Sequence, residues 1–241
     1  SRQAAQEGAV LLKNNGGLLP LAPDTRVALF GKGSFDYVKG GGGSGDVTAA
    51  YTRNVHDALK EELPLFAPLS DFYRDYVAGR YQAGDVPGLM AEPELPRELV
   101  DSAREQADAA VIVLSRFSGE GWDREPVLYQ EPDYPWPDEL DMPKRAKAVF
   151  PKGDYYLTEE ERRMVGQICA AFEKVAVILN VGGVVDVSWF REDDRVSSVL
   201  LAYQGGMEGG AAIAALLTGK ANPCGKLSDT FARDLSDYPS T

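Results

Sequence analysis

The chain has 241 residues, of which 44% are hydrophobic and 26% charged, and its formal net charge is −12 at pH 7. This length and composition can supply one large hydrophobic core, which excludes a disordered tail. The negative charge argues against nucleic acid as a partner, because phosphate binding needs clustered Lys and Arg.

The predicted secondary structure alternates between strands and helices along the chain. Apolar runs of strand length occur at 27–31, 109–114, 174–181 and 196–203. Helical patterns occupy 95–108, 158–173 and 207–219; the second opens with the capping box Thr158-x-x-Glu161, and Gly219 is placed to end the third. The apolar runs are continuous rather than alternating, which is typical of strands covered on both faces of a parallel sheet. We therefore predict an α/β fold, with a mostly parallel sheet and helices on both faces.

Unusual loops follow the first two of these strands. In open α/β sheets, ligands collect beyond the carboxyl ends of the strands. The first loop, GKGSFDYVKGGGGSGDV, covers 31–47, and the second runs from Arg116 to about Tyr156. The second is long and rich in Pro, Asp, Glu and aromatic residues, which favours an ordered insertion over a flexible linker. Both loops are expected at the ligand-binding edge of the sheet.

The glycines of the first loop allow three interpretations. Gly31 and Gly33 begin a pattern like that of dinucleotide-binding loops, but Asp36 stands where the third glycine should be, and no Walker A motif is present. A phosphate cradle made of backbone N–H groups alone is one alternative, and a flexible turn is another. We favour a backbone that approaches another surface closely, which only glycine permits.

The second loop opens with a carboxylate between two glycines, Ser118-Gly119-Glu120-Gly121. Glycines on both sides let the backbone turn sharply and leave the Glu120 carboxyl uncovered, as a group that reaches into a cleft must be. The alternative is an ordinary solvated loop carboxylate. Asp123 and Arg124, just beyond it, are interpreted by default as a local ion pair.

Five segments resemble, in the same order, the second domain of glycoside hydrolase family 3, the β-glucosidase family. They are EGAVLLKNNGGLLPL (7–21), KGGGGSGDV (39–47), SGEGWDR (118–124), VILNVGGVVDVSWF (177–190) and YQGGMEGGAAIAALLTGKANPCGKL (203–227). In that family the domain is a six-stranded α/β sandwich docked on a (β/α)₈ barrel. The resemblance covers nearly the whole chain. It implies a single sandwich domain over 1–241, an active-site insertion at about 116–156, and a barrel that is absent from this chain.

The resemblance also implies a retaining mechanism with two carboxylates. An Asp of the barrel attacks the anomeric carbon, and Glu120 protonates the leaving oxygen, with the two carboxyls about 5–5.5 Å apart. Glu120 must be protonated when it acts, so burial against Trp122 or the barrel should raise its pKa. No metal or organic cofactor is implied, and the partner is a β-linked glucoside or oligosaccharide. The residues expected to contact substrate are Lys39, Ser44, Asp46, Trp122 and Arg124.

The nucleophile of this mechanism is missing. In the family it lies in an SDW or SDY motif at the end of a barrel strand, and the two similar triplets here, 70–72 and 236–238, do not follow an apolar strand. We interpret both as turn or cap residues. The carboxyl-terminal segment is reminiscent of family members in which the sandwich precedes the barrel. The chain lacks both a starting Met and a signal-peptide pattern, which favours a piece of a longer, cytoplasmic protein.

Histidine and cysteine are too scarce for several other kinds of site. The one histidine, His56, disfavours a metal site with several His ligands and a His-dependent triad, and we interpret it as a structural residue on a helix. Cys169 and Cys224 show neither metal spacing nor a disulfide framework. The rival to a glycosidase domain is a non-catalytic α/β module that binds a sugar or a nucleotide at the 40–45 loop.

Overall fold

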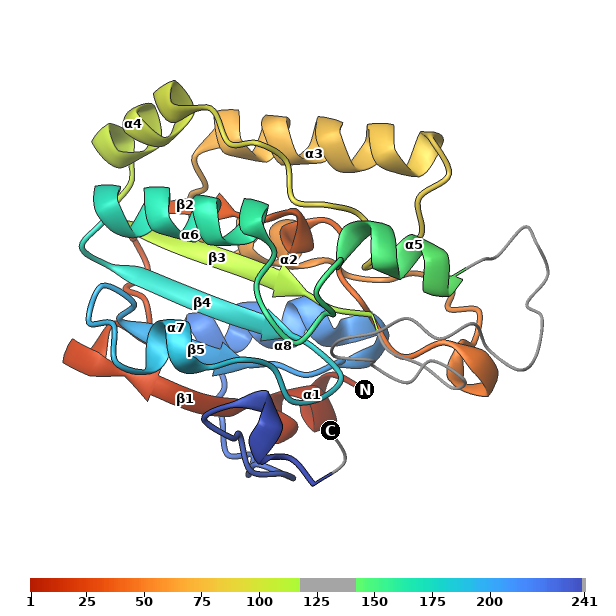
Figure 1. Ribbon diagram of the computed structural model, residues 1–241. Coiled ribbons are helices and arrows are strands. Elements are labelled where there is room, and N and C mark those ends of the chain that lie inside the picture. Colours follow the sequence, from red (N-terminus) through yellow and green to blue (C-terminus); the bar gives the residue numbers. More distant parts are fainter. Residues whose placement is uncertain (118–141, 240–241) are drawn as a thin grey trace.

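The computed structural model describes residues 1–117 and 142–239, and its centre is a five-stranded sheet in the order β1-β5-β4-β3-β2. Strands β2 to β5 are parallel, and β1 pairs with β5 in the antiparallel direction (Figure 1). The strands are β1 (Val10–Asn14), β2 (Val27–Phe30), β3 (Ala109–Ser115), β4 (Val175–Asn180) and β5 (Ser198–Leu201).

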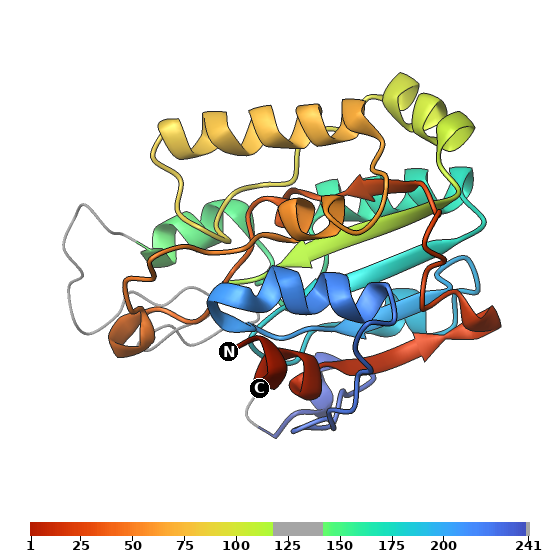
Figure 2. The same cartoon turned by 180° about the vertical axis from the view of Figure 1, so that it is seen from behind.

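Helices cover both faces of the sheet. They are α1 (Arg2–Gly8), α2 (Val55–Lys60), α3 (Ala67–Gln82), α4 (Arg97–Gln106), α5 (Met142–Val149), α6 (Glu159–Ala171), α7 (Ser188–Arg191) and α8 (Gly209–Leu217). One face is packed by α3, α4, α6 and α7, and the other by α2 and α8, with α1 beside α8 (Figures 1 and 2). Short 3₁₀ turns are η1 (Asn15–Gly17), η2 (Lys32–Ser34), η3 (Gly43–Gly45), η5 (Gly206–Glu208) and η6 (Leu235–Asp237).

The alternation of side chains along the strands builds two hydrophobic cores. Phe30 and Ile112 point to the face under α3, α4 and α6. Leu29 and Val111 point to the opposite face, under α2 and α8. Because both faces are covered, every residue of β2, β3, β4 and β5 is buried. This explains the continuous apolar runs of the sequence.

The elements predicted from apolar runs are confirmed with small shifts at their ends. The four predicted strands correspond to β2, β3, β4 and β5, and the three predicted helices to α4, α6 and α8. The capping box at Thr158 and Glu161 is formed in both directions. Gly219 takes a left-handed φ of 72° just after α8, as a helix-ending glycine should.

The expected strand count of six is wrong, since the residues that the structure describes form five strands. At the β2 edge, where a further strand could pair, the chain makes only one bridge, between Val27 and Leu65. Pro64 has no N–H to extend this pairing, and α3 begins at Ala67. The pairing therefore stops after one bridge.

Strand β1 was not predicted as a strand, although it lies in a segment that resembled the family. It is short and forms the other edge of the sheet, and the chain near the carboxyl terminus runs beside it: the Gly225 N–H donates to the Ala9 carbonyl (3.0 Å). Within residues 1–117 and 142–239, no helix is long and apolar enough to span a membrane.

Candidate functional site

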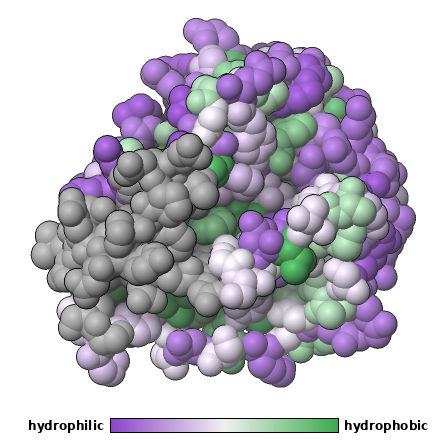
Figure 3. Space-filling model, turned by 90° about the vertical axis from the view of Figure 1, so that its right-hand side faces the viewer, coloured by the Kyte–Doolittle hydropathy of each residue, from purple (hydrophilic) through white to green (hydrophobic). Residues whose placement is uncertain are grey.

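The carboxyl ends of the parallel strands carry the loops that the sequence analysis singled out. The first loop, residues 31–47, is called the glycine loop and follows β2, and the second loop leaves β3 at Arg116. Figure 3 looks at the right-hand side of Figure 1, toward which β3 points, and shows apolar side chains among polar ones on this face. Two large apolar side chains near the glycine loop are exposed, Val47 by 67% and Tyr51 by 54%.

The first glycines of the loop have a packing reason. A Cβ at Gly31, whose φ is 90°, would overlap the backbone carbonyl of Val113 in β3. One at Gly33 would lie 2.8 Å from the same carbonyl oxygen. The loop therefore leaves β2 pressed against β3, and these two glycines are explained without a nucleotide.

Further along the loop, Gly42 comes close to an aromatic ring of the same chain, while the predicted approach to another surface stays a prediction. A Cβ there would lie 2.8 Å from the Cζ atom of the Phe117 ring. Gly40 and Gly45 have open space instead, so the approach is local to Gly42. Since Phe117 directly precedes residue 118, the glycine loop lies against the start of the second loop.

A buried polar cluster supports the base of the glycine loop. The Lys32 ammonium donates to the Asp36 carboxylate (2.8 Å) and to the Ser115 hydroxyl (3.0 Å). Asp36 also accepts from the Gly88 N–H (2.9 Å) and the Tyr81 hydroxyl (2.7 Å). Lys32 and Asp36 are 2% and 0% exposed. These contacts among the described residues hold the base of the loop in place.

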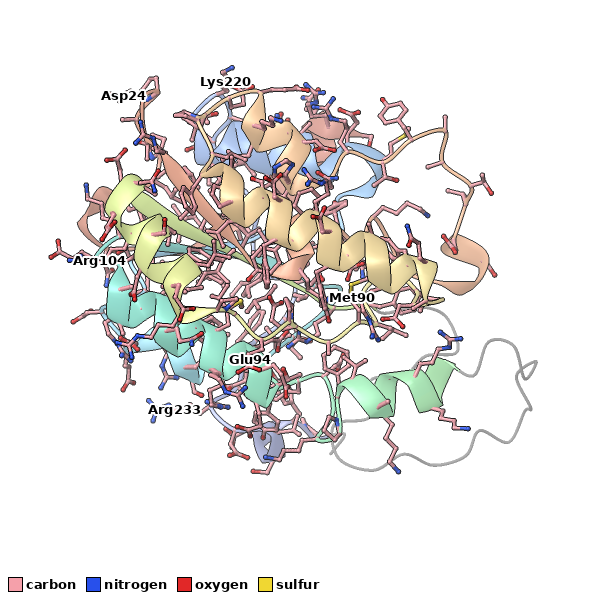
Figure 4. The ribbon with its side chains drawn as sticks, turned by 90° about the horizontal axis from the view of Figure 1, so that it is seen from above. Asp24, Met90, Glu94, Arg104, Lys220 and Arg233 are labelled. Atoms are coloured by element: carbon pink, nitrogen blue, oxygen red, sulfur yellow. The ribbon has the colours of Figure 1, made fainter. Side chains whose placement is uncertain are left out.

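Glu92 lies beneath the same loop, on the segment that joins α3 to α4. Figure 4 labels Met90 and Glu94, two residues to either side; Met90 is buried and Glu94 exposed. Both Glu92 oxygens accept from the Lys32 backbone N–H, at 3.3 and 3.1 Å. Burial raises the pKa of Glu92 to about 8, although the Lys32 charge opposes the shift. The carboxyl is therefore mostly protonated at neutral pH.

Asn180, at the end of β4, connects three loops. Its amide oxygen accepts from the Val38 N–H (2.8 Å), and its amide nitrogen donates to the carbonyls of Val38 (3.0 Å) and Tyr203 (2.7 Å). Its own carbonyl accepts from the Arg116 N–H (3.0 Å). The Asn180 side chain thus joins the loops after β2 and β5, and its backbone carbonyl holds the start of the loop after β3 beside them.

The structure places three of the expected substrate-contacting residues on the outer part of the glycine loop. The Lys39 ammonium donates to the Asp46 carboxylate (2.7 Å) and the Val47 carbonyl (3.1 Å). Ser44 is exposed in η3, between them in sequence. The expected residues Glu120, Trp122 and Arg124 lie outside the described residues. The structure therefore brings Lys39 and Asp46 together and leaves the other expected contacts as predictions.

Both triplets that resembled a nucleophile motif were expected to be turn or cap residues, which is confirmed for 236–238 and wrong for 70–72, which lie within α3. Asp71 lies on α3 with an exposed side chain and pairs with Arg74 (2.7 Å). Asp237 is in η6 and accepts from the Asp234 N–H (3.1 Å) in a capping box. His56 lies on α2 and is buried, and its ring stacks on that of Phe35 with the ring centroids 4.2 Å apart, which fits its interpretation as a structural residue.

A buried ion pair at the start of the second loop was not predicted from the sequence. Both guanidinium Nη atoms of Arg116 contact the Glu161 carboxylate at 2.6 Å. Burial acts to raise the pKa of Glu161, but the Arg116 charge and its hydrogen bonds outweigh burial and hold that pKa below its ordinary value. Arg116 was visible in the sequence only as a polar residue that ended a strand. Among the described residues, no group of three His, Cys, Asp or Glu side chains could hold a metal ion.

Comparison with known proteins adds a family and several relatives. Residues 9–241 match the family described as "Glycosyl hydrolase family 3 C-terminal domain". The chain is 51% identical to beta-glucosidase A of Butyrivibrio fibrisolvens, with 100% of this chain and 29% of the relative aligned. It is 35% identical to a beta-glucosidase of Ruminococcus albus, over 97% of this chain and 23% of the relative. The chain thus spans under a third of the length of these relatives.

A solved structure agrees with the sequence relatives. It is beta-glucosidase 3B from Thermotoga neapolitana in complex with alpha-D-glucose, which superposes with a TM-score of 0.83 at 34% identity. The match covers 99% of this chain and 31% of that chain. The observed α/β fold is therefore the fold of one part of a larger glycosidase.

Proposed function

This chain belongs to glycoside hydrolase family 3 as its C-terminal domain, and from that membership we propose that it supplies the general acid/base of a retaining β-glucosidase. The nucleophile would come from a (β/α)₈ barrel in the same polypeptide, and the sugar would lie between the two domains. The observation that carries the proposal is the family match over 9–241 together with 51% identity to a beta-glucosidase.

The geometry of the described residues supports a shared site rather than a self-contained one. The glycine loop packs against Phe117, so it lies beside the start of the insertion at about 116–156 that carries Glu120. Val47 and Tyr51 expose large apolar surfaces near the same loop. In the proposed arrangement the barrel covers these two side chains, which removes their apolar surface from water.

The proposed chemistry needs two proton transfers at one carboxyl. Glu120 gives its proton to the glycosidic oxygen as the barrel Asp attacks the anomeric carbon, and a covalent glycosyl-enzyme forms. Glu120, now ionised, takes a proton from a water whose oxygen attacks the anomeric carbon; the bond to the barrel Asp breaks, and the sugar leaves with its configuration retained. Trp122 would offer an apolar ring face to the sugar, and Arg124 a donor.

On the glycine loop, Lys39 and Asp46 are proposed to contact sugar hydroxyls or the barrel. Their ion pair is partly exposed, with 27% of the Lys39 side chain and 61% of the Asp46 side chain accessible. A donor and an acceptor side by side match the donor and acceptor character of a sugar hydroxyl. The exposed hydroxyl of Ser44 is proposed for the same role.

The first test is hydrolysis of an aryl β-glucoside by this chain alone, at high protein concentration, with Glu120→Ala beside it. We expect no turnover from either, because only one of the two carboxylates is present. Turnover that disappears in Glu120→Ala would refute the proposal that the nucleophile lies in a separate barrel.

The second test uses the intact polypeptide that carries the barrel. Glu120→Gln should reduce kcat/KM by about 10²–10⁴-fold for a poor leaving group such as an alkyl alcohol. The loss should be far smaller for 2,4-dinitrophenyl β-glucoside, whose leaving group needs no proton. The control is Asp71→Asn, which removes an exposed carboxylate on α3, and its kcat/KM should match that of the parent on both substrates. Equal losses on both substrates would refute the acid role.

A further inference from the structure

A buried ion pair lies where the insertion leaves and rejoins the sheet. Arg116 and Glu161 are 3% and 2% exposed, and both guanidinium Nη atoms contact carboxylate oxygens at 2.6 Å. Removing two charges from water is costly, and apolar pairs of similar volume often give equal or greater stability. Stability alone therefore does not account for an ion pair at this position.

The remaining donors of Arg116 reach backbone at both ends of the insertion. Its Nη1 atom donates to the carbonyl of Ser115, the last residue of β3 (3.0 Å). Its Nε and Nη2 atoms donate to the carbonyls of Asp154 (3.0 Å) and Tyr156 (3.3 Å), where the chain returns to α6. An arginine has five N–H donors in a rigid fork, and these contacts engage all of them. One side chain thus joins two chain segments about 40 residues apart in sequence.

Glu161 is itself fixed, so the pair has a rigid support. Its carboxylate also accepts from the Thr158 N–H (2.9 Å), and its N–H donates to the Thr158 hydroxyl (3.2 Å), in the capping box that begins α6. Further along α6, the buried residues Met164 and Ile168 pack in the core. The carboxylate therefore holds a constant position relative to the sheet.

The backbone of residue 116 is fixed as well. The Arg116 N–H donates to the Asn180 carbonyl (3.0 Å), and the Arg116 carbonyl accepts from the Gln204 amide (3.3 Å). The ring of Phe150 lies 4.8 Å from the guanidinium carbon and covers it. Every polar group of Arg116 thus has a partner, on a strand end, on α6, on the loop after β5 or at the end of the insertion.

We propose that Arg116 and Glu161 are positioning residues for the general acid: they fix the two ends of the insertion and, with them, the starting point of the chain that carries Glu120. This inference rests on the proposed function. Glu120 is four residues beyond Arg116 in sequence. An error of about 1 Å in the placement of a catalytic group can reduce the rate by 10²-fold, so a fixed starting point matters to proton transfer.

The test removes the pair without leaving a buried charge. In the intact polypeptide, the Arg116→Met/Glu161→Gln double variant replaces both ions by neutral groups of similar size, and Gln keeps the capping box. The matched control is Lys152→Met/Glu159→Gln. It makes the same changes in an ion pair that also joins the end of the insertion to the first turn of α6, but whose side chains are 77% and 65% exposed.

The readout separates positioning from folding. The carbonyls of Ser115, Asp154 and Tyr156 lose their donor in the double variant, so its midpoint of thermal unfolding should fall, and activity is compared at a temperature at which the variant stays folded. There, kcat/KM for an alkyl β-glucoside should fall by about 10–10²-fold. For 2,4-dinitrophenyl β-glucoside we expect kcat/KM to fall by less than about 3-fold, because kcat/KM reports the step that forms the glycosyl-enzyme and this leaving group needs no proton in that step. The control variant should match the parent on both substrates.

Two results would overturn the inference, and the parallel Glu120→Gln variant distinguishes them. If Glu120→Gln shows the leaving-group dependence and the double variant loses activity equally on both substrates, or not at all, the positioning role alone is refuted. If Glu120→Gln shows no such dependence, the proposed function fails first and the positioning role fails with it.

Discussion

The buried carboxyl of Glu92 leads to a prediction about the pH dependence of stability. Its pKa is about 8 in the folded protein against 4.5 as the ordinary value, because burial penalises the charged form. Between these two pH values the folded chain holds a proton that the unfolded chain has released. The free energy of unfolding therefore falls as the pH rises, by up to about 1.4 kcal/mol per pH unit.

The size of the effect follows from the interval between the two pKa values. Its contribution is fully present below pH 4.5 and is lost as the pH rises through about 8, a span of 3.5 units. At about 1.36 kcal/mol per unit, the loss amounts to at most about 5 kcal/mol. That is a large share of the total stability of a typical domain, which is about 5–15 kcal/mol.

The assay is urea unfolding at pH 5.5, 6.5 and 7.5, with Glu92→Gln compared with the parent. A Gln amide resembles the protonated carboxyl and can still accept from the Lys32 N–H. The free energy of unfolding of Glu92→Gln should therefore rise relative to that of the parent by about 1 kcal/mol per pH unit as the pH rises. Glu94→Gln, which removes an exposed carboxyl from the same segment, is the control, and its free energy of unfolding should change with pH as that of the parent does. If the free energy of unfolding of Glu92→Gln also changed with pH as that of the parent does, the reasoning would be refuted.

Three further predictions concern stability, each measured as a free energy of unfolding in urea. In the middle of α6, a Cβ at Gly166 meets nothing within 4 Å, so Gly166→Ala should stabilise the fold by about 0.5–1 kcal/mol. In α8, a methyl group at Gly210 would overlap backbone atoms at the start of α2, so Gly210→Ala should destabilise the fold by about 1–3 kcal/mol. Stability changes of the same sign in the two variants would contradict this prediction. Thr158→Ala removes one half of the capping box and should cost about 1 kcal/mol, so an unchanged midpoint would show that the cap contributes nothing. Asn180→Asp leaves the carbonyls of Val38 and Tyr203 without a donor and should cost at least about 2 kcal/mol; a smaller cost would mean that the loops after β2 and β5 hold together without this side chain.

The strands and helices that the sequence predicted are those with strong local signals. Residues 109–114 and 175–179 are apolar throughout because both faces of the sheet are covered. The start of α6 is visible in the sequence as the capping box of Thr158 and Glu161. Strand β1 is short and lies at an edge, so its pattern carried no such signal. The expected count of six strands was wrong for the described residues. At the β2 edge, Pro64 limits pairing to a single bridge, so no further strand forms there.

The outer part of the candidate site was partly accessible from the sequence. Lys39 and Asp46 were selected by their place in the glycine loop, and the structure joins them in an ion pair. The glycines at 31 and 33 looked like a fragment of a nucleotide loop. Their actual role, close packing against the backbone of Val113, depends on a strand about 80 residues away in sequence.

The sequence by itself determined the fold class and the family, because hydrophobic periodicity, caps and contiguous motifs are local properties of the chain. Only the tertiary structure decided which polar residues hold the edge of the sheet together. Arg116 and Glu161 are 45 residues apart, and Asn180 is 142 residues from Val38. Parallel strands bring their carboxyl ends to one edge whatever their separation along the chain, so a contact made there has no local pattern to reveal it.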